Sequence, residues 1–556
     1  MKFAREHKGH TAERRGGEKI EPLGLIQRAV PRIAKDDAED AARTCRTRPY
    51  DLGGGRRSHL PRFLTHLSAS TGMSDPFNTS TADSGTSKTR NLNRARYAML
   101  DRTSFVVPPA PPVHPTDLPP LKLLLGSIRN SLAIFPDYAF DTAFSRSKAF
   151  GVESVLVNDP EGVRYMMATN AANFVRPGMT ARIMRAVVGQ GVFLAEGGEW
   201  RRQRRLLSPP FSPRQVSILF PHFIAAANDL ADELEGQASA DLSDAYQVAA
   251  LNAVLRALFS LPEQDERSHI GGLVRRYITG PGRPQLFDAF ATSETSFAFT
   301  LGRRRSFQKR WFAAVDSLVI ARRSAPHGAG HRDLLDLLIA VRDPQTGEAL
   351  SDDEVRDQCA TMIFAGYETT ARLLFWASYL LTLDHCEQSR LRAEVAAFPP
   401  ERVTSLDDLN HWPRLRLVLL ETMRLYPPAP ILVREPVEDD EIMGEPVRRG
   451  VQVYIAPWVL HRHRKHWQHP TAFMPERFAG QSSPWTSGGA YMPFGAGPRI
   501  CIGAAFAIFE AQIVLATILN RYTLAIEDKR PVMPVGRLTI QPSYPPVFRL
   551  EKARSG

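Results

Sequence analysis

A cysteine in a glycine-punctuated loop is the strongest chemical signal in the sequence. Cys501 follows PFGAGPRI and stands directly before IGAAFAIFEAQIVLATILNRY, whose apolar residues have helical spacing. A thiol at a helix N-terminus faces unpaired backbone N–H groups and the positive end of the helix dipole, which lower its pKa. Gly495, Gly497 and Gly503 let the backbone approach a flat or bulky group. We therefore predict that Cys501 is a functional thiolate and not an inert core side chain.

An acid beside an alcohol is the second signal. Glu368 and Thr369 lie in the segment AGYETT, within a long run of helical spacing. Such a pair can relay protons between water and a buried site. Alternatively, the hydroxyl of Thr369 bonds back to a carbonyl of its own helix. Gly366 costs about 1 kcal/mol relative to alanine within a helix, which either a close helix crossing or a groove for a ligand would explain.

Three further patterns combine arginine with acidic or aromatic residues. Glu421 and Arg424 in ETMR share one helix face, and Trp200 and Arg204 in WRRQR stand four apart. The segment PERF contributes Arg477. Taken singly, these patterns are weak, because a solvated ion pair contributes roughly a few tenths of a kcal/mol. The segment LHRHRKHW holds three histidines without regular ligand spacing, so we predict no metal site there.

Together these motifs resemble those of the cytochrome P-450 family. The segments occur in the family's order between about residues 121 and 552. The loop FGAGPRICIG is similar to the family's haem-binding loop at Phe494, Gly497, Arg499, Cys501 and Gly503. The resemblance implies a mainly α fold with a minor β region, in which a long central helix passes over the haem and a proximal loop carries the cysteine.

The resemblance also implies roles for individual residues. Cys501 would be the axial thiolate ligand of the iron of haem b, a ligand that favours O–O cleavage. Glu368 and Thr369 would be catalytic. Further haem-binding residues would be Trp200, Arg204, Arg434, Arg499, Phe494, Gly495, Gly503, Ala365 and Gly366. A structural salt-bridge network behind the haem would comprise Glu421, Arg424 and Arg477. The substrate pocket would include Ile363, Phe364, Ala429, Ile431, Leu432 and Thr539.

The implied function is a monooxygenase that activates O2 and hydroxylates or epoxidises an apolar small organic substrate. Because no flavin or iron–sulfur segment follows Cys501, we expect a separate electron donor, a ferredoxin or flavoprotein system. A peroxygenase on the same fold is an alternative, which the intact acid–alcohol pair disfavours. A non-catalytic haem sensor or carrier is another, and it gives no reason for that pair. Arg201, Arg202 and Arg205 around Arg204 form either a solvated basic face or a docking face for an acidic redox partner.

Composition and charge set the remaining expectations. The chain has 556 residues, 43% hydrophobic and 23% charged, as in ordinary globular proteins. The net charge of +11 is concentrated in the first 100 residues, which hold 19 basic and 11 acidic side chains, so we expect no nucleic-acid partner. Two apolar runs, Ala360–Leu383 and Ala504–Leu519, are interrupted by charges, and no secretory signal is visible, so we expect no membrane anchor and a cytoplasmic protein resembling soluble bacterial members.

Three regions are expected along the chain. Residues 1–100 read as a basic, disordered tail, and Met73 and Met99 within it are alternative starts that would leave part of the tail out of the native protein. Residues 101–120 read as a proline-rich, extended lead-in. Residues 121–556 form the haem domain. In it, helical patterns dominate to about residue 398, and the stretch after Ser351 reads as one helix of more than thirty residues or as two. Short strands and turns follow residue 399.

Overall fold

The computed structural model describes residues 105–260, 264–280, 282, 301–324, 333–480 and 489–552. The predicted tail, residues 1–100, lies outside these ranges. The α-helices are α3 (Pro120–Arg129), α4 (Pro160–Arg164), α5 (Gly178–Val188), α6 (Gly197–Leu207), α7 (Pro213–Ser217), α8 (Phe220–Glu233), α9 (Leu242–Phe259), α10 (Gln264–Thr279), α12 (Leu301–Ser324), α13 (Leu334–Ala340), α14 (Asp352–Leu383), α15 (His385–Ala397), α16 (Pro413–Leu425), α17 (Pro457–Leu460) and α18 (Ala504–Arg521).

Short helical turns and strands complete the described elements. The turns are η1 (Ser131–Ile134), η2 (Asp137–Phe140), η3 (Tyr165–Thr169), η4 (Pro400–Arg402), η5 (Asp407–His411), η6 (Pro475–Phe478) and η7 (Gly497–Arg499). The strands are β1 (Phe144–Ala149), β2 (Val152–Val157), β3 (Phe174–Val175), β4 (Ser239–Ala240), β5 (Leu432–Pro436), β6 (Asp440–Ile442), β7 (Glu445–Val447), β8 (Gln452–Ile455), β9 (Tyr522–Ile526), β10 (Pro534–Gly536), β11 (Ile540–Pro542) and β12 (Phe548–Lys552). The mainly α fold with a minor β region is therefore confirmed.

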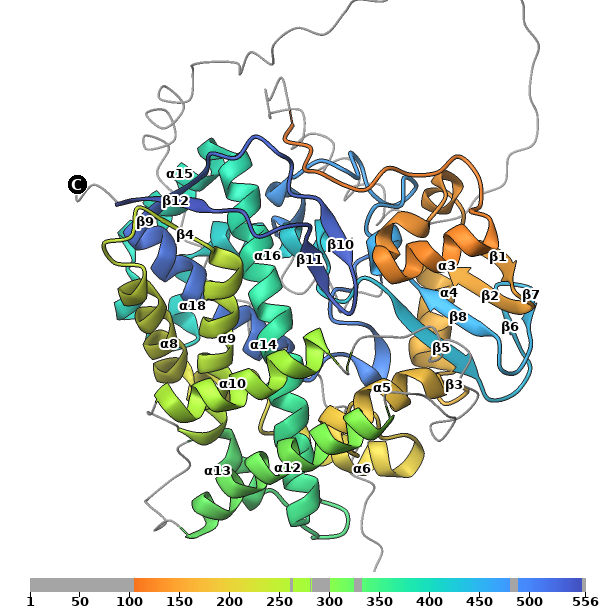
Figure 1. The fold of residues 1–556 in the computed structure, drawn as a ribbon, viewed down its shortest axis with the longest axis horizontal. Coiled ribbons are helices and arrows are strands. Elements are labelled where there is room, and N and C mark those ends of the chain that lie inside the picture. Colours follow the sequence, from red (N-terminus) through yellow and green to blue (C-terminus); the bar gives the residue numbers. More distant parts are fainter. Residues whose placement is uncertain are drawn as a thin grey trace, which may run out of the picture. The chain divides into compact units, whose positions relative to one another are not determined.

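Helix α14 runs through the middle of the helical part (Figure 1). Its start is a capping box, in which the Ser351 side chain accepts from the Glu354 N–H and the Glu354 carboxylate accepts from the Ser351 N–H. The long run predicted after Ser351 forms two helices, because the backbone of Asp384 leaves the helical conformation and its side chain caps α15. Helices α9 and α18 pack along α14, so most of its surface is buried.

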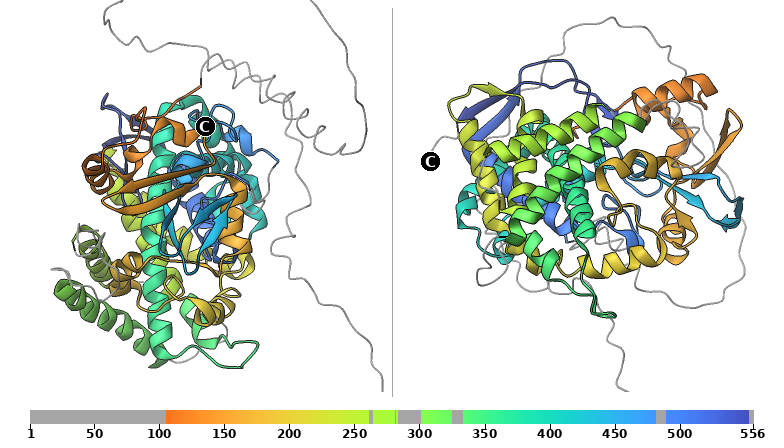
Figure 2. Two further views of the ribbon diagram at one scale, coloured as in Figure 1. Left: turned by 90° about the vertical axis from the view of Figure 1, so that its right-hand side faces the viewer. Right: turned by 60° about the horizontal axis from the view of Figure 1, so that its bottom comes forward.

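The β structure lies mainly beside the helical part (Figures 1 and 2). A five-stranded sheet has the order β1-β2-β8-β5-β3, in which β2 and β8 are parallel and the other pairs antiparallel. Smaller sheets pair β10 with β11, β6 with β7, and β12 with both β4 and β9. The hairpin of β1 and β2 interrupts the stretch from residue 121 to about residue 398, which is mostly helical as predicted. It turns at Phe150 and Gly151, both at positive φ.

Two packed clusters of apolar side chains hold these elements. The larger joins α14 to α8, α9, α16 and α18, and the smaller lies under β2, β5 and β8 and includes residues of η3. Within the described ranges, α18 is the helix whose length and apolar composition would allow it to cross a membrane, and 67% of that span is buried inside the protein. Its apolar character therefore has a packing explanation in the core.

The start of the described chain crosses the surface of the helical part. Residues 105–113 form neither helix nor strand. The N–H of Phe473 donates to Val106 O at 2.9 Å, and the hydroxyl of Tyr426 donates to Pro109 O at 3.0 Å. The proline-rich lead-in thus contacts the segment between α16 and η6, and α3 begins within it at Pro120.

Candidate active site

The Cys501 loop is shaped by two glycines and by its packing on η3. The N–H of Cys501 donates to Phe494 O at 2.8 Å, and the loop passes through positive φ at Gly495 and Gly497. A Cβ atom on Gly497 would lie 1.8 Å from Met167 O, so only glycine fits there. Helix α18 begins three residues after Cys501, with Gly503 as its N-cap residue. The local sequence thus positions the thiol at the entrance of a helix.

The thiol of Cys501 is accessible, yet protein surrounds it closely. Its side chain is exposed, and it has no disulfide. Burial raises its pKa, while the Gly503 N–H and the charge of Arg204 lower it. The helix terminus therefore lowers the thiol pKa as expected, but desolvation raises this pKa by more. Because a metal cation displaces the thiol proton, coordination at this sulfur would yield the thiolate.

Three arginines share the neighbourhood of a single carboxylate beyond this loop, and two of them contact it. Arg176 and Arg499 both bind Glu196, the Arg176–Glu196 pair at 3.2 Å. Burial, with repulsion from Arg434 and Arg499, lowers the pKa of Arg176 to about 9. Burial, with repulsion from Arg499, lowers the pKa of Arg434 to about 10. One carboxylate does not neutralise three desolvated cations, so this cluster fits a further anionic group.

Helix α6 borders the arginine cluster. The guanidinium of Arg499 lies over the ring of Trp200, 4.4 Å from its centroid. Four residues on, Arg204 interacts electrostatically with Cys501, and burial lowers its pKa. Trp200 and Arg204 are thus both near the cysteine loop, with Trp200 against an arginine and Arg204 beside the thiol.

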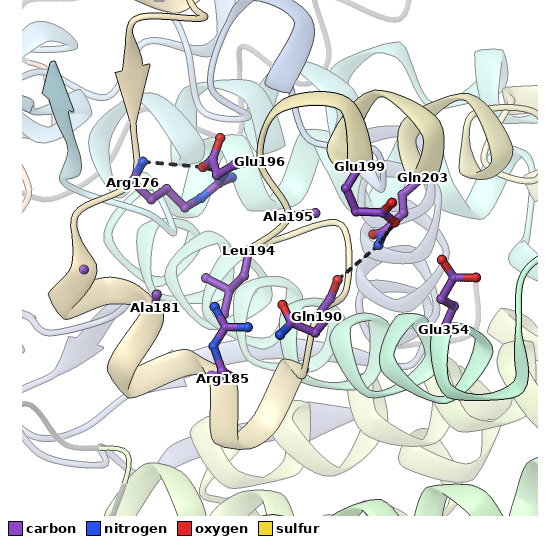
Figure 3. A pocket seen from close by; sticks show the side chains of 11 residues that line it. Arg176, Ala181, Arg185, Gln190, Leu194, Ala195, Glu196, Glu199, Gln203 and Glu354 are labelled. Atoms are coloured by element: carbon purple, nitrogen blue, oxygen red, sulfur yellow. Dashed lines mark hydrogen bonds and ion pairs between the residues drawn. The ribbon is translucent and has the colours of Figure 1, made fainter. Parts of the chain in front are cut away.

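A cavity of about 470 Å³ adjoins the same cluster (Figure 3). It lies between α5, α6 and the start of α14, and Arg176 and Glu196 form one side of it. Gln190 and Gln203 face each other there, and the Gln203 amide donates to Gln190 O at 3.1 Å. The cavity therefore places accessible space directly against Arg176.

The middle of α14 has accessible surface where its neighbours are buried. Ala365 is exposed and Thr369 half-buried. The hydroxyl of Thr369 donates to Ala365 O at 2.7 Å, the back-bond that was the alternative to a relay. A Cβ on Gly366 would lie 2.9 Å from Val254 of α9, so a close helix crossing explains this glycine. The α-helix is continuous through this region.

The carboxylate of Glu368 points away from Thr369. It accepts from Thr539 Oγ1 at 2.9 Å and from Gln541 Nε2 at 3.1 Å, and Arg372 Nε lies 4.0 Å away. Glu368 as a whole residue is only 3% exposed. The acid and the alcohol are adjacent in sequence, but the described contacts do not include a hydrogen bond between them.

The residues predicted as a salt-bridge network do meet. The Arg424 guanidinium donates two bonds of 2.8 Å to the Glu421 carboxylate, and Arg477 donates a third at 3.0 Å. Glu421 also accepts the Met474 N–H at 2.8 Å. Arg424 donates to the carbonyl of His461 and two others, which ties α16 to the chain before η6. Glu421 and Arg424 are fully buried, so this unit fixes the scaffold.

The predicted pocket residues divide into two groups. Ile363, Phe364 and Thr539 are buried, and the Phe364 ring packs edge-on to Tyr277 of α10 at 6.3 Å between centroids. The partly buried group comprises Ala429, Ile431 and Leu432. Thr539 binds Glu368, so its hydroxyl is engaged inside the protein. The structure therefore gives Thr539 a positioning contact in place of an open pocket surface.

The basic face predicted on α6 is largely neutralised. Arg202 pairs with Glu199 and Glu354, and Arg205 binds Asp343 at 2.8 Å. Arg201 is exposed and has no ion pair within the described ranges. An acidic partner would therefore find less free charge here than the sequence indicates.

Two features of the site were missed in the sequence. Arg176 and Glu196 complete the arginine cluster, but nothing in their spacing connects them with Arg434 and Arg499. Gln541 of β11 donates a hydrogen bond to the Glu368 carboxylate, which is also a contact between residues far apart in the sequence. The sequence marks these residues only as charged or polar positions beside proline or glycine.

These observations test the fit of a haem. A flat iron-bearing group with two carboxylates needs a metal-binding side chain and cations. The accessible thiol of Cys501 supplies the first, and the under-neutralised cluster of Arg176, Arg434 and Arg499 supplies the second. Within the described ranges, no group of three or more His, Cys, Asp or Glu side chains could hold a metal ion instead. The residues present therefore fit haem.

The comparisons with known proteins agree with this site. Residues 140–547 match the family model described as cytochrome P-450. A chloroplastic Arabidopsis thaliana protein named LUTEIN DEFICIENT 5 is 28% identical over 74% of this chain and 73% of its own. A Streptomyces melanosporofaciens cyclooctat-9-en-7-ol 5-monooxygenase is 30% identical over 66% and 79%. Human cytochrome P-450 4V2 is 27% identical over 64% and 72%.

Solved structures agree as well. The crystal structure of a cytochrome P-450DA haem domain is similar with a TM-score of 0.64 and 25% identity, and the match covers 81% of this chain and 98% of that one. The chain belongs to the cytochrome P-450 family. It is a haem b oxidoreductase of the monooxygenase type. Its relatives include plant, human and bacterial proteins, so the family membership does not single out the bacterial members.

Proposed function

We propose that this protein inserts one oxygen atom from O2 into an apolar small organic substrate, by hydroxylation or epoxidation. The accessible thiol of Cys501 at the start of α18 is the observation that carries this proposal. The Streptomyces relative supports the substrate class, since its name specifies oxygenation of a cyclic hydrocarbon alcohol. The apolar side chains of Ile431 and Leu432, which are partly buried, support it too as residues of the predicted substrate pocket.

The chain's own groups have distinct tasks in this proposal. Cys501 Sγ would hold the haem iron, and the Gly503 N–H and the Arg204 charge stabilise the anionic form of this sulfur. The cluster of Arg434, Arg499 and Arg176 would bind the two carboxylates of the cofactor. When bound, the haem would supply the iron at which O2 is activated. The remaining predicted contacts to the cofactor would be made by Trp200, Phe494, Gly495, Gly503, Ala365 and Gly366.

Proton delivery is assigned to Thr369 and Glu368. The Thr369 hydroxyl is half-buried and releases its bond to Ala365 O by rotation about χ1. Glu368 has two donors and a nearby Arg372, which hold its carboxylate in one place. We assign Thr369 the proton transfer at the reacting centre and Glu368 the supply of protons from water. The Glu421, Arg424 and Arg477 unit has a structural role.

Partner, localisation and domain limits are also part of the proposal. Electrons come from a separate ferredoxin or flavoprotein system, and the protein is cytoplasmic and soluble. Residues 121–556 form the haem domain, preceded by the lead-in 101–120 and a basic tail. Reconstitution with each donor system, together with cell fractionation, tests these assignments.

Turnover with isotopically labelled O2 tests the function. The holoprotein, with an added redox system, is incubated with a panel of fatty acids, terpenoids, steroids and small aromatics, after an optical titration has identified binders. We expect one labelled oxygen atom in the product. For Thr369→Ala we expect electron consumption to continue while peroxide replaces product. Thr382→Ala is the matched control, since Thr382 lies in the same helix and is also bonded to a carbonyl within it.

Two outcomes contradict the proposal. Unlabelled oxygen in the product, with hydrogen peroxide alone supporting turnover, identifies a peroxygenase. Unchanged coupling in the Thr369→Ala protein removes the proton-transfer assignment.

A further inference from the structure

Glu510 is a buried acid in the middle of an apolar helix. It lies in α18, is fully buried, and neither carboxyl oxygen has a hydrogen-bond partner among the described residues. Thr370 in α14 is 1% exposed, and its hydroxyl likewise has no hydrogen-bond partner among the described residues. Two orphaned polar groups in one interface are unusual, because each costs about 1–3 kcal/mol when left unpaired.

The two groups are neighbours. Burial raises the pKa of Glu510 well above its ordinary range, and the Thr370 hydroxyl, which is close enough to interact with the carboxyl group as a donor, lowers it. The two side chains nevertheless lie outside good hydrogen-bonding geometry. No charged side chain of the described residues contributes to this shift. Among the charged groups on elements packed against α18, Asp232 pairs with Arg521, Arg372 with Glu368, Arg414 with Glu387 and Arg424 with Glu421. Arg392 of α15 donates to Leu519 O, and the Glu394 carboxylate accepts the N–H groups of Arg414 and Leu415. Glu510 therefore has no cation to favour its ionised form.

Thr370 and Glu510 lie in the two helices that carry or follow the proposed catalytic and metal-binding residues. Thr370 directly follows Thr369 in α14, and Glu510 stands nine residues after Cys501. Because α18 begins at Ala504, Glu510 lies about 9 Å along the helix from its first residue, at 1.5 Å per residue. Helices α14 and α18 pack directly on each other. A bond between these side chains thus joins the helix of the acid–alcohol pair to the helix that follows the thiol.

We propose that Glu510 is a positioning residue of the thiolate site: as a neutral carboxylic acid it donates a hydrogen bond to Thr370 Oγ1 and holds α18, with Cys501 before its first turn, against α14. The effect of this link on haem binding rests on the proposed function, whereas the hydrogen bond itself does not depend on that function. The carboxylic acid supplies the donor, and the threonine oxygen has two acceptor sites. Such a bond gives the acid proton and the Thr370 oxygen a partner.

Infrared difference spectroscopy tests the protonation state. The spectrum of the wild-type protein is compared with that of Glu510→Gln, which keeps the volume and a donor but has no carboxyl group. We expect a carboxylic acid carbonyl band that shifts in heavy water and persists from neutral to alkaline pH. In Thr370→Val this band moves to the frequency of a free acid. A carboxylate band in its place, or a band unmoved by Thr370→Val, overturns the hydrogen bond.

Haem release and the carbon monoxide difference spectrum of the reduced protein test the positioning role. For Thr370→Val and Glu510→Leu we expect release about tenfold faster, the change that one lost buried hydrogen bond brings. We also expect part of the thiolate-type spectrum to be lost. Glu510→Gln retains both properties within about twofold. Thr517→Val is the matched control, since Thr517 is a buried hydroxyl of α18 bonded within its own helix, to Ile513 O at 2.9 Å.

The outcomes separate this inference from the proposed function. Wild-type spectra and release rates in Thr370→Val, with an intact fold, overturn the positioning role while haem binding stands. Wild-type protein that binds no haem overturns both the proposed function and the positioning role. The infrared band still decides whether Glu510 and Thr370 are bonded.

Discussion

Replacing Arg434 by methionine is expected to have opposite effects on the haem-free and haem-bound protein. Burial and the neighbouring Arg499 lower the pKa of Arg434 from 12.5 to about 10. At about 1.4 kcal/mol for each factor of ten in the dissociation constant, holding this cation in the haem-free fold costs about 3 kcal/mol. Methionine removes that cost but also removes the bond to Val433 O, which contributes about 1 kcal/mol.

The haem-free Arg434→Met protein is therefore expected to gain about 2 kcal/mol in its free energy of unfolding, the difference between these two effects. The haem-bound protein loses a cation that binds a cofactor carboxylate, so we expect haem release about ten- to a hundredfold faster, as for a lost charged hydrogen bond. Urea unfolding of both forms and haem transfer to an acceptor protein measure the two effects.

An exposed arginine provides the control for this prediction. Arg549 is about half exposed and pairs with Glu527 and Glu551, so Arg549→Met should change stability by less than about 0.5 kcal/mol. The reasoning is refuted if haem-free Arg434→Met is less stable than the wild type. The arginine cluster would then not be a set of mutually repelling cations awaiting an anion.

Three other predictions concern the scaffold. Glu421→Gln breaks the buried pair with Arg424 and should lower the free energy of unfolding by about 3–5 kcal/mol in urea; a loss below about 1 kcal/mol contradicts the network's role. His461 is buried, which lowers its pKa to about 3, below its ordinary 6.5, and its Nε2 accepts the Met492 N–H. As the pH falls, the unfolded chain therefore protonates this histidine before the folded protein does. The contribution of His461 to the free energy of unfolding is complete above about pH 6.5 and decreases toward pH 3, by up to about 1.4 kcal/mol per pH unit. His461→Gln should flatten this dependence, and an unchanged slope in acid titration contradicts it. Gly497→Ala should prevent a stable haem-binding loop, because its Cβ would meet Met167 O at 1.8 Å, whereas Gly495→Ala should cost only about 1–2 kcal/mol; equal haem content in the two variants contradicts this.

Local patterns explain why much of the fold and site could be predicted. The Cys501 loop and the Glu421–Arg424 pair each lie within a few residues of sequence, so the chain's own spacing brings their parts together. The capping residues at Ser351 likewise predicted the start of α14. The hairpin of β1 and β2 was missed because its turn uses Phe150 and Gly151, and phenylalanine at positive φ is an uncommon hairpin signal.

Long-range contacts explain the rest. Arg176 and Arg499 meet only because the fold joins the segment before α5 to the cysteine loop, and no periodicity relates their positions. The orientation of Glu368 is equally non-local, since Thr539 and Gln541 hold it from the other end of the chain. The thiol pKa differed from expectation because desolvation depends on all surrounding elements, whereas the helix terminus is visible in the sequence.

The carbon monoxide difference spectrum of the reduced protein tests the central claim most directly. The wild-type protein should show the thiolate-type spectrum, and Cys501→Ala should lose it. Cys359→Ala is the control, because Cys359 is a fully buried thiol in α14 whose pKa burial raises, and this variant should keep the spectrum. A thiolate-type spectrum that persists in Cys501→Ala, or folded wild-type protein that binds no added haem, would contradict the assignment of Cys501 as the iron ligand.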